Sequence, residues 1–241
     1  MEAVKTNVIG VQNIIEVAIE HNVQKLIAIS TDKVVNPTNT MGATKMLSEK
    51  LISAANYYKG SRKTVFSCVR FGNVMGSRGS VIPLFKEQIR TGKPITLTHN
   101  EMTRFMMTIP QAAQLVLKAA QYSVGGETFV LKMPTLRIKD LAIGLIRSYE
   151  AASGHEYTGL INEVGIRPGE KLDEELMTID ESERALVNEE MFIIPSPYSS
   201  AITSYDGFER ASVNGYSSKN ARQLMLEEIE ELLNKYHLGF S

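Results

Sequence analysis

Apolar runs and helical patterns alternate along the first third of the chain, and this alternation constrains the fold more than any other feature. Residues 2–21 repeat apolar side chains at helical spacing, and a short apolar run follows at 25–30. A second helical pattern covers 41–58, and a second apolar run covers 64–70. Strands that alternate with helices are typical of a parallel sheet with helices on its faces. The sequence therefore predicts an α/β protein.

The same alternation continues to about residue 154, after which the composition changes. Further elements are expected as strands at 94–98, 127–132 and 158–165 and as helices at 80–91, 111–121 and 138–150. Residues 196–218 are rich in Ser, Tyr, Gly and Pro, which is typical of irregular structure. A final helix follows, capped by Ser217 or Ser218. We expect residues 155–241 to form mainly a smaller C-terminal lobe that closes over a substrate.

The composition is that of an ordinary globular protein, with 43% apolar residues, 22% charged residues and a formal net charge of −1. Because there is no basic excess, we expect no nucleic-acid partner. No apolar run reaches the roughly 20 residues that cross a bilayer, so we expect no membrane segment and a cytoplasmic protein. Cys68 lies in an apolar strand pattern and is expected to be a buried structural thiol. The four histidines lack the spacing of metal ligands, so no metal site is expected.

The first helix is not preceded by the strand and glycine-rich turn that open a doubly wound nucleotide-binding domain. That turn normally receives the pyrophosphate of a dinucleotide. Glycines at 72, 76 and 79 form a loop, but their spacing is not that of a dinucleotide-binding turn. For residues 1–154 we therefore expect a partial doubly wound, Rossmann-like parallel sheet that begins in mid-domain, with segments of the smaller lobe interleaved in it.

Polar side chains gather where the first predicted strand ends. Thr31, Asp32 and Lys33 follow the apolar run, and the next helix carries Met41 and Lys45 four residues apart on one face. In an open α/β sheet, ligands bind at the carboxyl ends of the strands. A hydroxyl, a carboxylate and two ammonium groups at this edge predict an active site. The alternative is a plain strand-end turn, with a capping Thr or Asp and a solvated Lys.

Five segments, in order along the chain, carry a resemblance to a known family: Ser30–Lys45, Val69–Phe85, Met102–Thr108, Gly126–Pro134 and Arg167–Leu172. They resemble the extended short-chain dehydrogenase/reductases that act on sugar nucleotides. Within these they are most similar to the UDP-N-acetylglucosamine 4,6-dehydratase group of polysaccharide biosynthesis proteins. The resemblance implies a tightly held NADP (or NAD) and a UDP-sugar substrate. It also implies dehydration of UDP-N-acetylglucosamine (UDP-GlcNAc) to a 4-keto-6-deoxy sugar nucleotide.

The resemblance further implies roles for the residues at the first strand end. Lys33 would be the base that removes the C5 proton, and it must be neutral at least transiently to do so. Asp32 would be the acid that assists departure of the C6 hydroxyl. Thr31 would hydrogen-bond the C4 oxygen, and Lys45 would bind the ribose of the cofactor.

Two other residues of this region have less settled roles. Met41 stands where the common pattern of the family has a tyrosine, and a thioether cannot remove a hydroxyl proton. Asp32, or a water relayed to Lys45, would then accept the proton of the C4 hydroxyl, while Met41 fills space beside the nicotinamide. Asn7 would lie near the cofactor, as the matching residue does in similar proteins, or would be a polar residue of a helix face.

A second group of residues is implied to bind the UDP part of the substrate. Planar guanidinium groups suit the oxygens of a diphosphate through paired hydrogen bonds. The resemblance places Asn73, Arg104 and Arg167 around the UDP, with Arg78 as a further candidate and Glu170 positioning Arg167 or the sugar. For each arginine the alternative is a surface charge or a salt bridge between lobes.

Two other functions stay open on the sequence. One is a sugar-nucleotide 4-epimerase, although Asp32 and Lys33 favour elimination over simple return of the hydride. The other is a nucleotide-sugar-binding fragment without catalysis, because no cofactor-binding turn precedes the first helix. Similar proteins associate through helices around this site, so we expect a homo-oligomer formed through helices 2–21 and 41–58.

Overall fold

The structure, a computed structural model, describes residues 1–77, 79–198 and 204–240. The chain divides into two compact units, each built from three segments that are distant in sequence. Unit 1 consists of Met1–Gly72, Pro110–Lys132 and Glu175–Ser217, and unit 2 of Asn73–Ile109, Met133–Glu174 and Ser218–Ser241. This division differs from the expected boundary between residues 154 and 155, because Glu175–Ser217 belongs to the same unit as the first strands.

Unit 1 is built on a mixed six-stranded sheet. Its strand order is β1 (Lys25–Thr31), β2 (Val65–Phe71), β6 (Thr128–Leu131), β11 (Met191–Ile194), β10 (Leu186–Val187) and β12 (Glu209–Arg210). The first three strands are parallel, which confirms the predicted α/β fold with a parallel sheet. The last three are antiparallel to their neighbours and were not predicted. A separate antiparallel ribbon joins β9 (Glu175–Met177) and β13 (Tyr216–Ser217), and the short helix α7 (Ile179–Ser182) follows β9.

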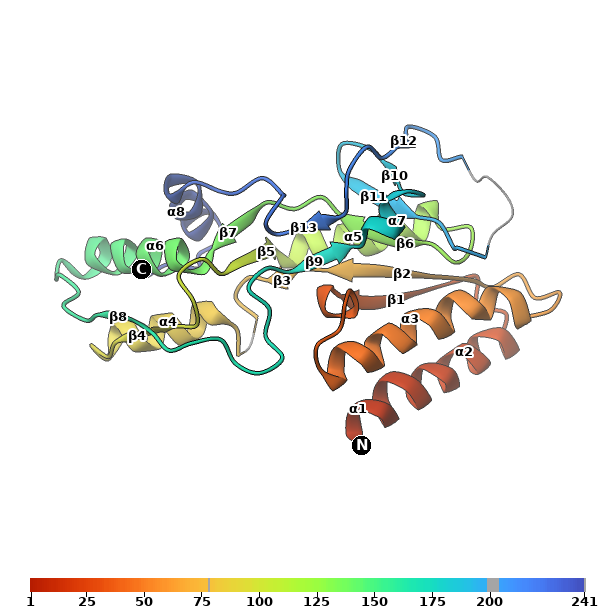
Figure 1. Cartoon of the computed structure of the whole chain (residues 1–241), viewed down its shortest axis with the longest axis horizontal. Coiled ribbons are helices and arrows are strands. Elements are labelled where there is room, and N and C mark those ends of the chain that lie inside the picture. The colour runs from red at the N-terminus through yellow and green to blue at the C-terminus, as the bar shows by residue number, and fades with distance from the viewer. Residues whose placement is uncertain (78, 199–203, 241) are drawn as a thin grey trace. The chain divides into compact units, whose positions relative to one another are not determined.

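Helices cover both faces of this sheet (Figure 1). They are α1 (Glu2–Val4), α2 (Gly10–Glu20), α3 (Thr40–Tyr58) and α5 (Ile109–Tyr122), with a π-helical turn η1 (Lys5–Ile9) before α2 and a 3-10 turn η2 (Asp32–Val34) after β1. Phe66 and Cys68 of β2 pack with α2 and α3, whereas Val69 packs with α5, because successive side chains of a strand alternate between faces. Cys68 is buried, as predicted, and its burial together with the charge of Glu49 raises the pKa of its thiol.

Unit 2 has two small sheets and three helices around a separate apolar core. One sheet has the order β3 (Asn73–Val74), β5 (Thr103–Met107) and β7 (Thr135–Arg137), and the other pairs β4 (Ile95–Leu97) with β8 (Ile161–Glu163). The helices are α4 (Val81–Arg90), α6 (Ile138–Ser153) and α8 (Leu226–Lys235). Gly144 of α6 faces Ile229 and Leu233 of α8, where a Cβ would lie 3.4 Å from each side chain, so these helices pack closely.

The prediction that Ser217 or Ser218 caps the final helix was wrong. The N-cap of α8 is Met225, whose backbone N–H donates to the carboxylate of Glu228 at 2.8 Å. Ser217 instead lies in β13, and the hydroxyl of Ser218 contacts the hydroxyl of Thr103 at 2.6 Å. Both serines therefore lie before the last helix begins, and neither caps it.

The part of the chain that the structure describes contains neither a candidate membrane span nor a candidate metal-binding cluster. No helix there combines the length and the apolar character that a membrane span requires. The described His, Cys, Asp and Glu side chains do not form a group of three or more that could hold a metal ion.

Candidate active site

Thr31, Asp32 and Lys33 form one hydrogen-bonded cluster at the carboxyl end of β1. The Asp32 side chain is only 4% exposed, and its carboxylate accepts hydrogen bonds from the Thr31 hydroxyl at 2.8 Å and from the Lys33 ammonium at 3.0 Å. These neighbours can meet because the chain leaves the strand for the turn η2 at this point, whereas side chains within a strand point to opposite faces. The structure therefore brings three of the predicted catalytic residues together.

Helix α3 packs against this turn and presents Lys45 from its second turn. Asn39 caps the helix by accepting a hydrogen bond from the backbone N–H of Gly42 at 2.9 Å. Lys45 donates to the carbonyl oxygen of Ile29 in β1 at 3.0 Å. An ammonium has three donors, so two donors of Lys45 have no partner among the described residues. Met41, one turn earlier, is 42% exposed.

Gly42 allows α3 to lie directly against the backbone of η2. A Cβ added at Gly42 would overlap the carbonyl oxygen of Lys33, and a backbone atom cannot turn aside as a flexible side chain can. We therefore expect Gly42→Ala to lower the free energy of unfolding by about 2 kcal/mol, measured by chemical denaturation. Gly10→Ala is the matched control, because a Cβ there would lie 3.4 Å from the carbonyl oxygen of Lys5, an ordinary contact. Equal effects of the two substitutions would contradict this interpretation.

Asn7 lies in the π-helical turn η1 and links that turn to α3 through two hydrogen bonds. Its side-chain amide donates to the Thr44 hydroxyl at 3.0 Å, and its backbone carbonyl accepts a hydrogen bond from Ser48. A π-helical turn interrupts the regular hydrogen-bond ladder and is frequent at functional sites. The structure thus places Asn7 beside the helix that carries Lys45, and its contact with a cofactor stays a prediction.

A buried ion-pair network in unit 1 was not predicted. Arg70 of β2 contacts Glu49 of α3 and Glu181 of α7, each at 2.8 Å, and donates to the carbonyl oxygen of Leu176 at 2.9 Å. Burial by itself raises the pKa of Glu181, but the hydrogen bonds and charge of Arg70 outweigh it and lower that pKa to about 2. The available signal was an arginine inside an apolar strand pattern, because a buried guanidinium requires carboxylate partners.

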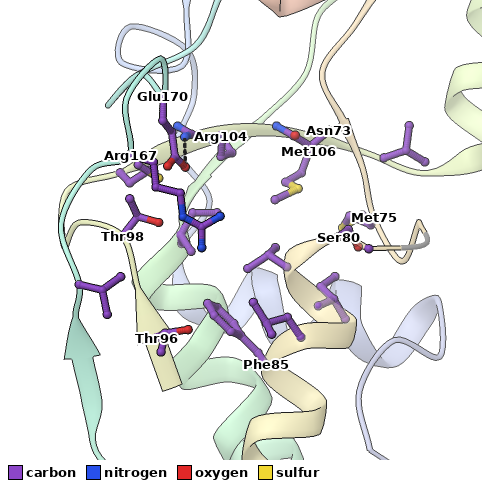
Figure 2. A pocket seen from close by; sticks show the side chains of 18 residues that line it. Asn73, Met75, Ser80, Phe85, Thr96, Thr98, Arg104, Met106, Arg167 and Glu170 are labelled. Carbon is purple, nitrogen blue, oxygen red and sulfur yellow. Dashed lines mark hydrogen bonds and ion pairs between the residues drawn. The ribbon is translucent and has the colours of Figure 1, made fainter. Parts of the chain in front are cut away.

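Unit 2 contains a pocket of about 300 Å³ (Figure 2). It is surrounded by α4, β4, β5 and residues 164–170. Much of the lining is apolar, with side chains that include Met75, Val81, Ile82, Phe85, Met102, Met106 and Ile138. Four of the predicted substrate-binding residues also line it: Asn73, Arg104, Arg167 and Glu170. A largely apolar cavity with a few polar groups is typical of a small-molecule site.

Arg104 is buried, and all three nitrogens of its guanidinium contact other groups of the protein. Nε lies 3.2 Å from the carboxylate of Glu174. One terminal nitrogen donates to two carbonyl oxygens, and the other donates to a third carbonyl oxygen and lies 3.4 Å from the carboxylate of Glu170. The carbonyl groups are those of Thr103, Lys171 and Leu172.

Asn73 is likewise held from within unit 2. Its amide nitrogen donates to both carboxylate oxygens of Glu174, at 3.0 and 2.8 Å, and to the carbonyl oxygen of Phe105 at 3.3 Å. Because a carboxylate only accepts hydrogen bonds, this contact fixes the orientation of the amide. The group that Asn73 can offer to a ligand is therefore its side-chain oxygen. Glu174, which organises both Asn73 and Arg104, was not predicted.

Arg167 differs from Arg104. Its guanidinium is exposed and points into the pocket (Figure 2). This guanidinium makes no hydrogen bond or ion pair with the other residues that the structure describes. Arg78, the remaining predicted substrate residue, lies outside the described residues.

Comparison with known proteins gives the family of the chain. Residues 1–196 match a family model described as polysaccharide biosynthesis protein. The chain is 52% identical over 235 residues to an uncharacterized membrane protein of Methanocaldococcus jannaschii, which covers 97% of this chain and 68% of that protein. It is 50% identical over 195 residues to the capsular polysaccharide biosynthesis protein CapD of Staphylococcus aureus, which covers 79% of this chain but only 31% of CapD.

Two other relatives are named for reactions of sugar nucleotides. The UDP-glucose 4-epimerase of Rickettsia rickettsii is 40% identical over 237 residues, 97% of this chain and 68% of that protein. The UDP-N-acetylglucosamine 4,6-dehydratase (inverting) of Campylobacter jejuni is 39% identical over 223 residues, 92% of this chain and 63% of that protein. The chain thus spans about two thirds of these relatives and less than a third of CapD.

Solved structures agree with the fold. The X-ray structure of Pen from Bacillus thuringiensis has a TM-score of 0.90 at 45% identity, covering 99% of this chain and 70% of that chain. A UDP-glucuronic acid 4-epimerase from Bacillus cereus, solved in complex with UDP-4-deoxy-4-fluoro-glucuronic acid and NAD, has a TM-score of 0.58 at 22% identity. The match covers 70% of this chain and 57% of that chain, and at this identity it supports only the similarity of the fold. The resemblance predicted from the sequence is confirmed: the chain belongs to the polysaccharide biosynthesis protein family, among the sugar-nucleotide dehydratases and epimerases of the short-chain dehydrogenase/reductases.

Proposed function

We propose that the protein is a lyase that uses NADP to dehydrate UDP-GlcNAc to a 4-keto-6-deoxy sugar nucleotide, for polysaccharide or glycan biosynthesis. The observation that carries this proposal is the buried carboxylate of Asp32, bonded to the hydroxyl of Thr31 and the ammonium of Lys33. Loss of water across C5 and C6 requires a base and an acid close together, and this cluster offers both. The likeness to the Campylobacter dehydratase supports the choice of reaction.

The contacts within the cluster indicate how its members would act. The Thr31 hydroxyl donates its hydrogen to Asp32, so its oxygen can accept a hydrogen bond from the C4 hydroxyl of the sugar. When Asp32 takes up the C4 hydroxyl proton, its ion pair with Lys33 weakens. Lys33, whose side chain is 39% exposed, can then release its own proton to solvent and remove the C5 proton, while Asp32 delivers the C4 hydroxyl proton to the departing C6 oxygen.

Lys45 and Asn7 are the residues that would hold a nicotinamide cofactor on unit 1. The cofactor would supply the hydride acceptor for C4 and the hydride donor for C6. The two donors of Lys45 that have no partner among the described residues suit the two hydroxyl groups of a ribose. The half-exposed thioether of Met41 offers an apolar surface for a ring and takes no proton.

The pocket of unit 2 would bind the UDP. Its apolar wall suits the flat face of a uracil ring, and the exposed guanidinium of Arg167 suits the diphosphate. The side-chain oxygen of Asn73 can accept a hydrogen bond from a ring N–H or a hydroxyl. Glu170, held near Arg104, can accept a hydrogen bond from a sugar hydroxyl.

A sugar-nucleotide epimerase is the second candidate, because the Rickettsia relative is named for that reaction. Epimerisation at C4 removes and returns one hydride without loss of water. It therefore gives no role to an acid and a base aimed at C6 and C5. The Asp32–Lys33 pair is the feature of this chain that favours the dehydratase.

Mass spectrometry of the product tests the proposal. The longest form of the protein that its gene encodes is incubated with UDP-GlcNAc and NADP, and we expect a sugar nucleotide that has lost one water. A product of unchanged mass with inverted C4 would show the epimerase instead. Bound UDP-GlcNAc without either product would leave only a binding function.

We also propose that the protein forms a homo-oligomer through α2 and α3 and acts in the cytoplasm. Apolar side chains are exposed along this part of the chain, among them Ile9, Ile14, Val17, Met46 and Leu47, and exposed apolar patches mark interaction surfaces.

The proposal that the protein acts in the cytoplasm is supported by Cys68, because its unpaired thiol fits a reducing compartment.

A further inference from the structure

We infer that the C-terminal tail, residues 238–240, positions the apolar wall of the unit 2 pocket, the wall against which a uracil ring would lie. The inference rests on the proposed function, because it takes the uridine part of a sugar nucleotide as the ligand of that wall. The match to the family model ends at residue 196, so the tail lies outside the matched region.

The wall is formed in part by helix α4 and the residues just before it. Met75 and Phe85 line the pocket (Figure 2), as does Ile82, and all three belong to the apolar core of unit 2. Gly76 follows Met75 with a φ of +72°, a conformation that favours glycine. Because glycine restricts the backbone less than any other residue, the position of Met75 relative to α4 depends on contacts from other parts of unit 2.

The tail makes such contacts with Gly76 and with α4. Leu238 lies against Gly76, where an added Cβ would be 2.8 Å from the leucine side chain. The ammonium of Lys86, on α4, donates to the carbonyl oxygen of Leu238 at 3.3 Å and to that of Gly239. It also lies 5.0 Å from the centre of the Phe240 ring, within the range of a cation–π interaction. The tail therefore holds the residues before α4 and the helix itself.

The tail can support the wall because helix α6 fixes it in turn. The backbone N–H of Phe240 donates to the hydroxyl of Ser148 at 2.8 Å, and its ring meets the edge of Tyr149 at 5.2 Å between ring centres. A Cβ added at Gly239 would overlap the hydroxyl oxygen of Ser148, so the tail passes directly against α6. The wall of the pocket is thus tied to α6 through a segment that is about 150 residues away from α4 in sequence.

Binding of uridine and of UDP tests the inference in the longest form of the protein that its gene encodes. Leu238→Ala shortens the side chain that lies against Gly76, and Lys86→Met removes the donors to the tail while keeping the length of the side chain. We expect each variant to bind uridine about fivefold more weakly, because the wall is then less preorganised. UDP should lose the same factor, since the diphosphate contact is assigned to Arg167, and calorimetry measures both affinities.

Three outcomes of these titrations contradict the inference. One is a wild-type affinity for uridine in either variant, and another is weaker binding of UDP alone. The third comes from the double variant, in which both substitutions act through the same tail and should weaken uridine binding by less than the product of their separate effects. A double variant that shows the full product would mean that Lys86 and Leu238 act independently.

Lys86→Arg is the conservative variant. It keeps a cation with N–H donors for the carbonyl groups of the tail, so we expect its affinity for uridine to stay within twofold of the wild-type value. If Lys86→Arg bound uridine as weakly as Lys86→Met does, loss of the donors would not explain the effect, and the positioning role would be refuted.

Tyr157→Phe is the control for general destabilisation of unit 2. It removes the hydrogen bond of 2.6 Å from the Tyr157 hydroxyl to the carbonyl oxygen of Lys93, and Tyr157 does not line the pocket. We expect this variant to be less stable than the wild-type chain but to bind uridine within twofold of it. Equal weakening of uridine binding in Tyr157→Phe and Leu238→Ala would show that loss of stability, and not the tail, is the cause.

Amide hydrogen exchange tests the positioning role without a ligand. We expect exchange in residues 75–77 and 80–85 to be at least about tenfold faster in Leu238→Ala and in Lys86→Met, and unchanged in residues 161–163 of β8. If the wild-type chain binds neither uridine nor UDP, the proposed function fails. Unchanged exchange beside α4 in both variants would separately refute the positioning role of the tail.

Discussion

Replacing Arg70 with methionine is expected to lower the free energy of unfolding by about 3–5 kcal/mol, as breaking a buried ion pair does in other proteins. The guanidinium of Arg70 lies between the carboxylates of Glu49 and Glu181, and all three side chains are largely shielded from water. Methionine fills a similar volume, so the loss comes mainly from two carboxylates left without their cation. Urea denaturation of the variant measures the change.

Arg147→Met is the matched control for this substitution. Arg147 also pairs with a glutamate, Glu230 at 2.8 Å, but its side chain is 53% exposed. Exposed ion pairs contribute about 1 kcal/mol or less, so the control should change stability little. A loss below 1 kcal/mol for Arg70→Met, equal to that of the control, would show that the network does not stabilise unit 1.

The dependence of stability on pH gives a second test of the same network. The pKa of Glu181 is about 2 in the folded chain and about 4.3 in an unfolded chain, so the stabilisation is present above pH 4.3. This contribution to the free energy of unfolding is lost as the pH falls toward 2, and the difference between the two pKa values corresponds to about 3 kcal/mol. In Arg70→Met most of this part of the acid-induced loss should disappear, because Arg70 lowers the pKa of Glu181 more than the backbone N–H of Thr178 and the charge of Arg184 do.

The sequence predicts the parallel half of the large sheet well, and the reason lies in local patterns. The strand at β2 is an apolar run between two helical patterns, and the helix at α3 has a capping residue, Asn39, followed by helical spacing. Strand β5 was missed because Thr-Arg-Phe-Met-Met combines a charged residue with buried neighbours, and nothing local shows that Arg104 has five contacts. The antiparallel strand β11 was missed because its partner, β6, lies about 60 residues earlier.

The same distinction applies to the candidate sites. Thr31, Asp32 and Lys33 are neighbours in sequence, so the motif predicts the cluster that the structure contains. Glu174 and Glu181 were missed, because they meet their arginines only through contacts across 70 and 111 residues. A motif indicates which residue types a site holds. Whether a given arginine faces a ligand or another part of the protein depends on topology, which no local pattern contains.

Asp32→Asn is expected to lower the rate of dehydration at least 100-fold in the longest form of the protein that its gene encodes. The change is isosteric, but an amide can neither take up the C4 hydroxyl proton nor deliver it to the C6 oxygen, and general acid–base groups contribute about 10²–10⁴-fold. It also removes the charge that holds Lys33 at 3.0 Å. The rate of formation of the 4-keto-6-deoxy product at saturating UDP-GlcNAc is the quantity to measure.

Two comparisons locate the effect of Asp32→Asn in the chemical step. Asp180→Asn, in the same unit but with a side chain that is 90% exposed, should keep full activity. The affinity of Asp32→Asn for UDP should stay within twofold of the wild-type value, because the diphosphate contacts are assigned to unit 2. Lys33→Met should be at least as slow, since it removes the base that abstracts the C5 proton. If Asp32→Asn retained more than a tenth of the wild-type rate, Asp32 would not be the acid, and the buried cluster would serve only to end strand β1.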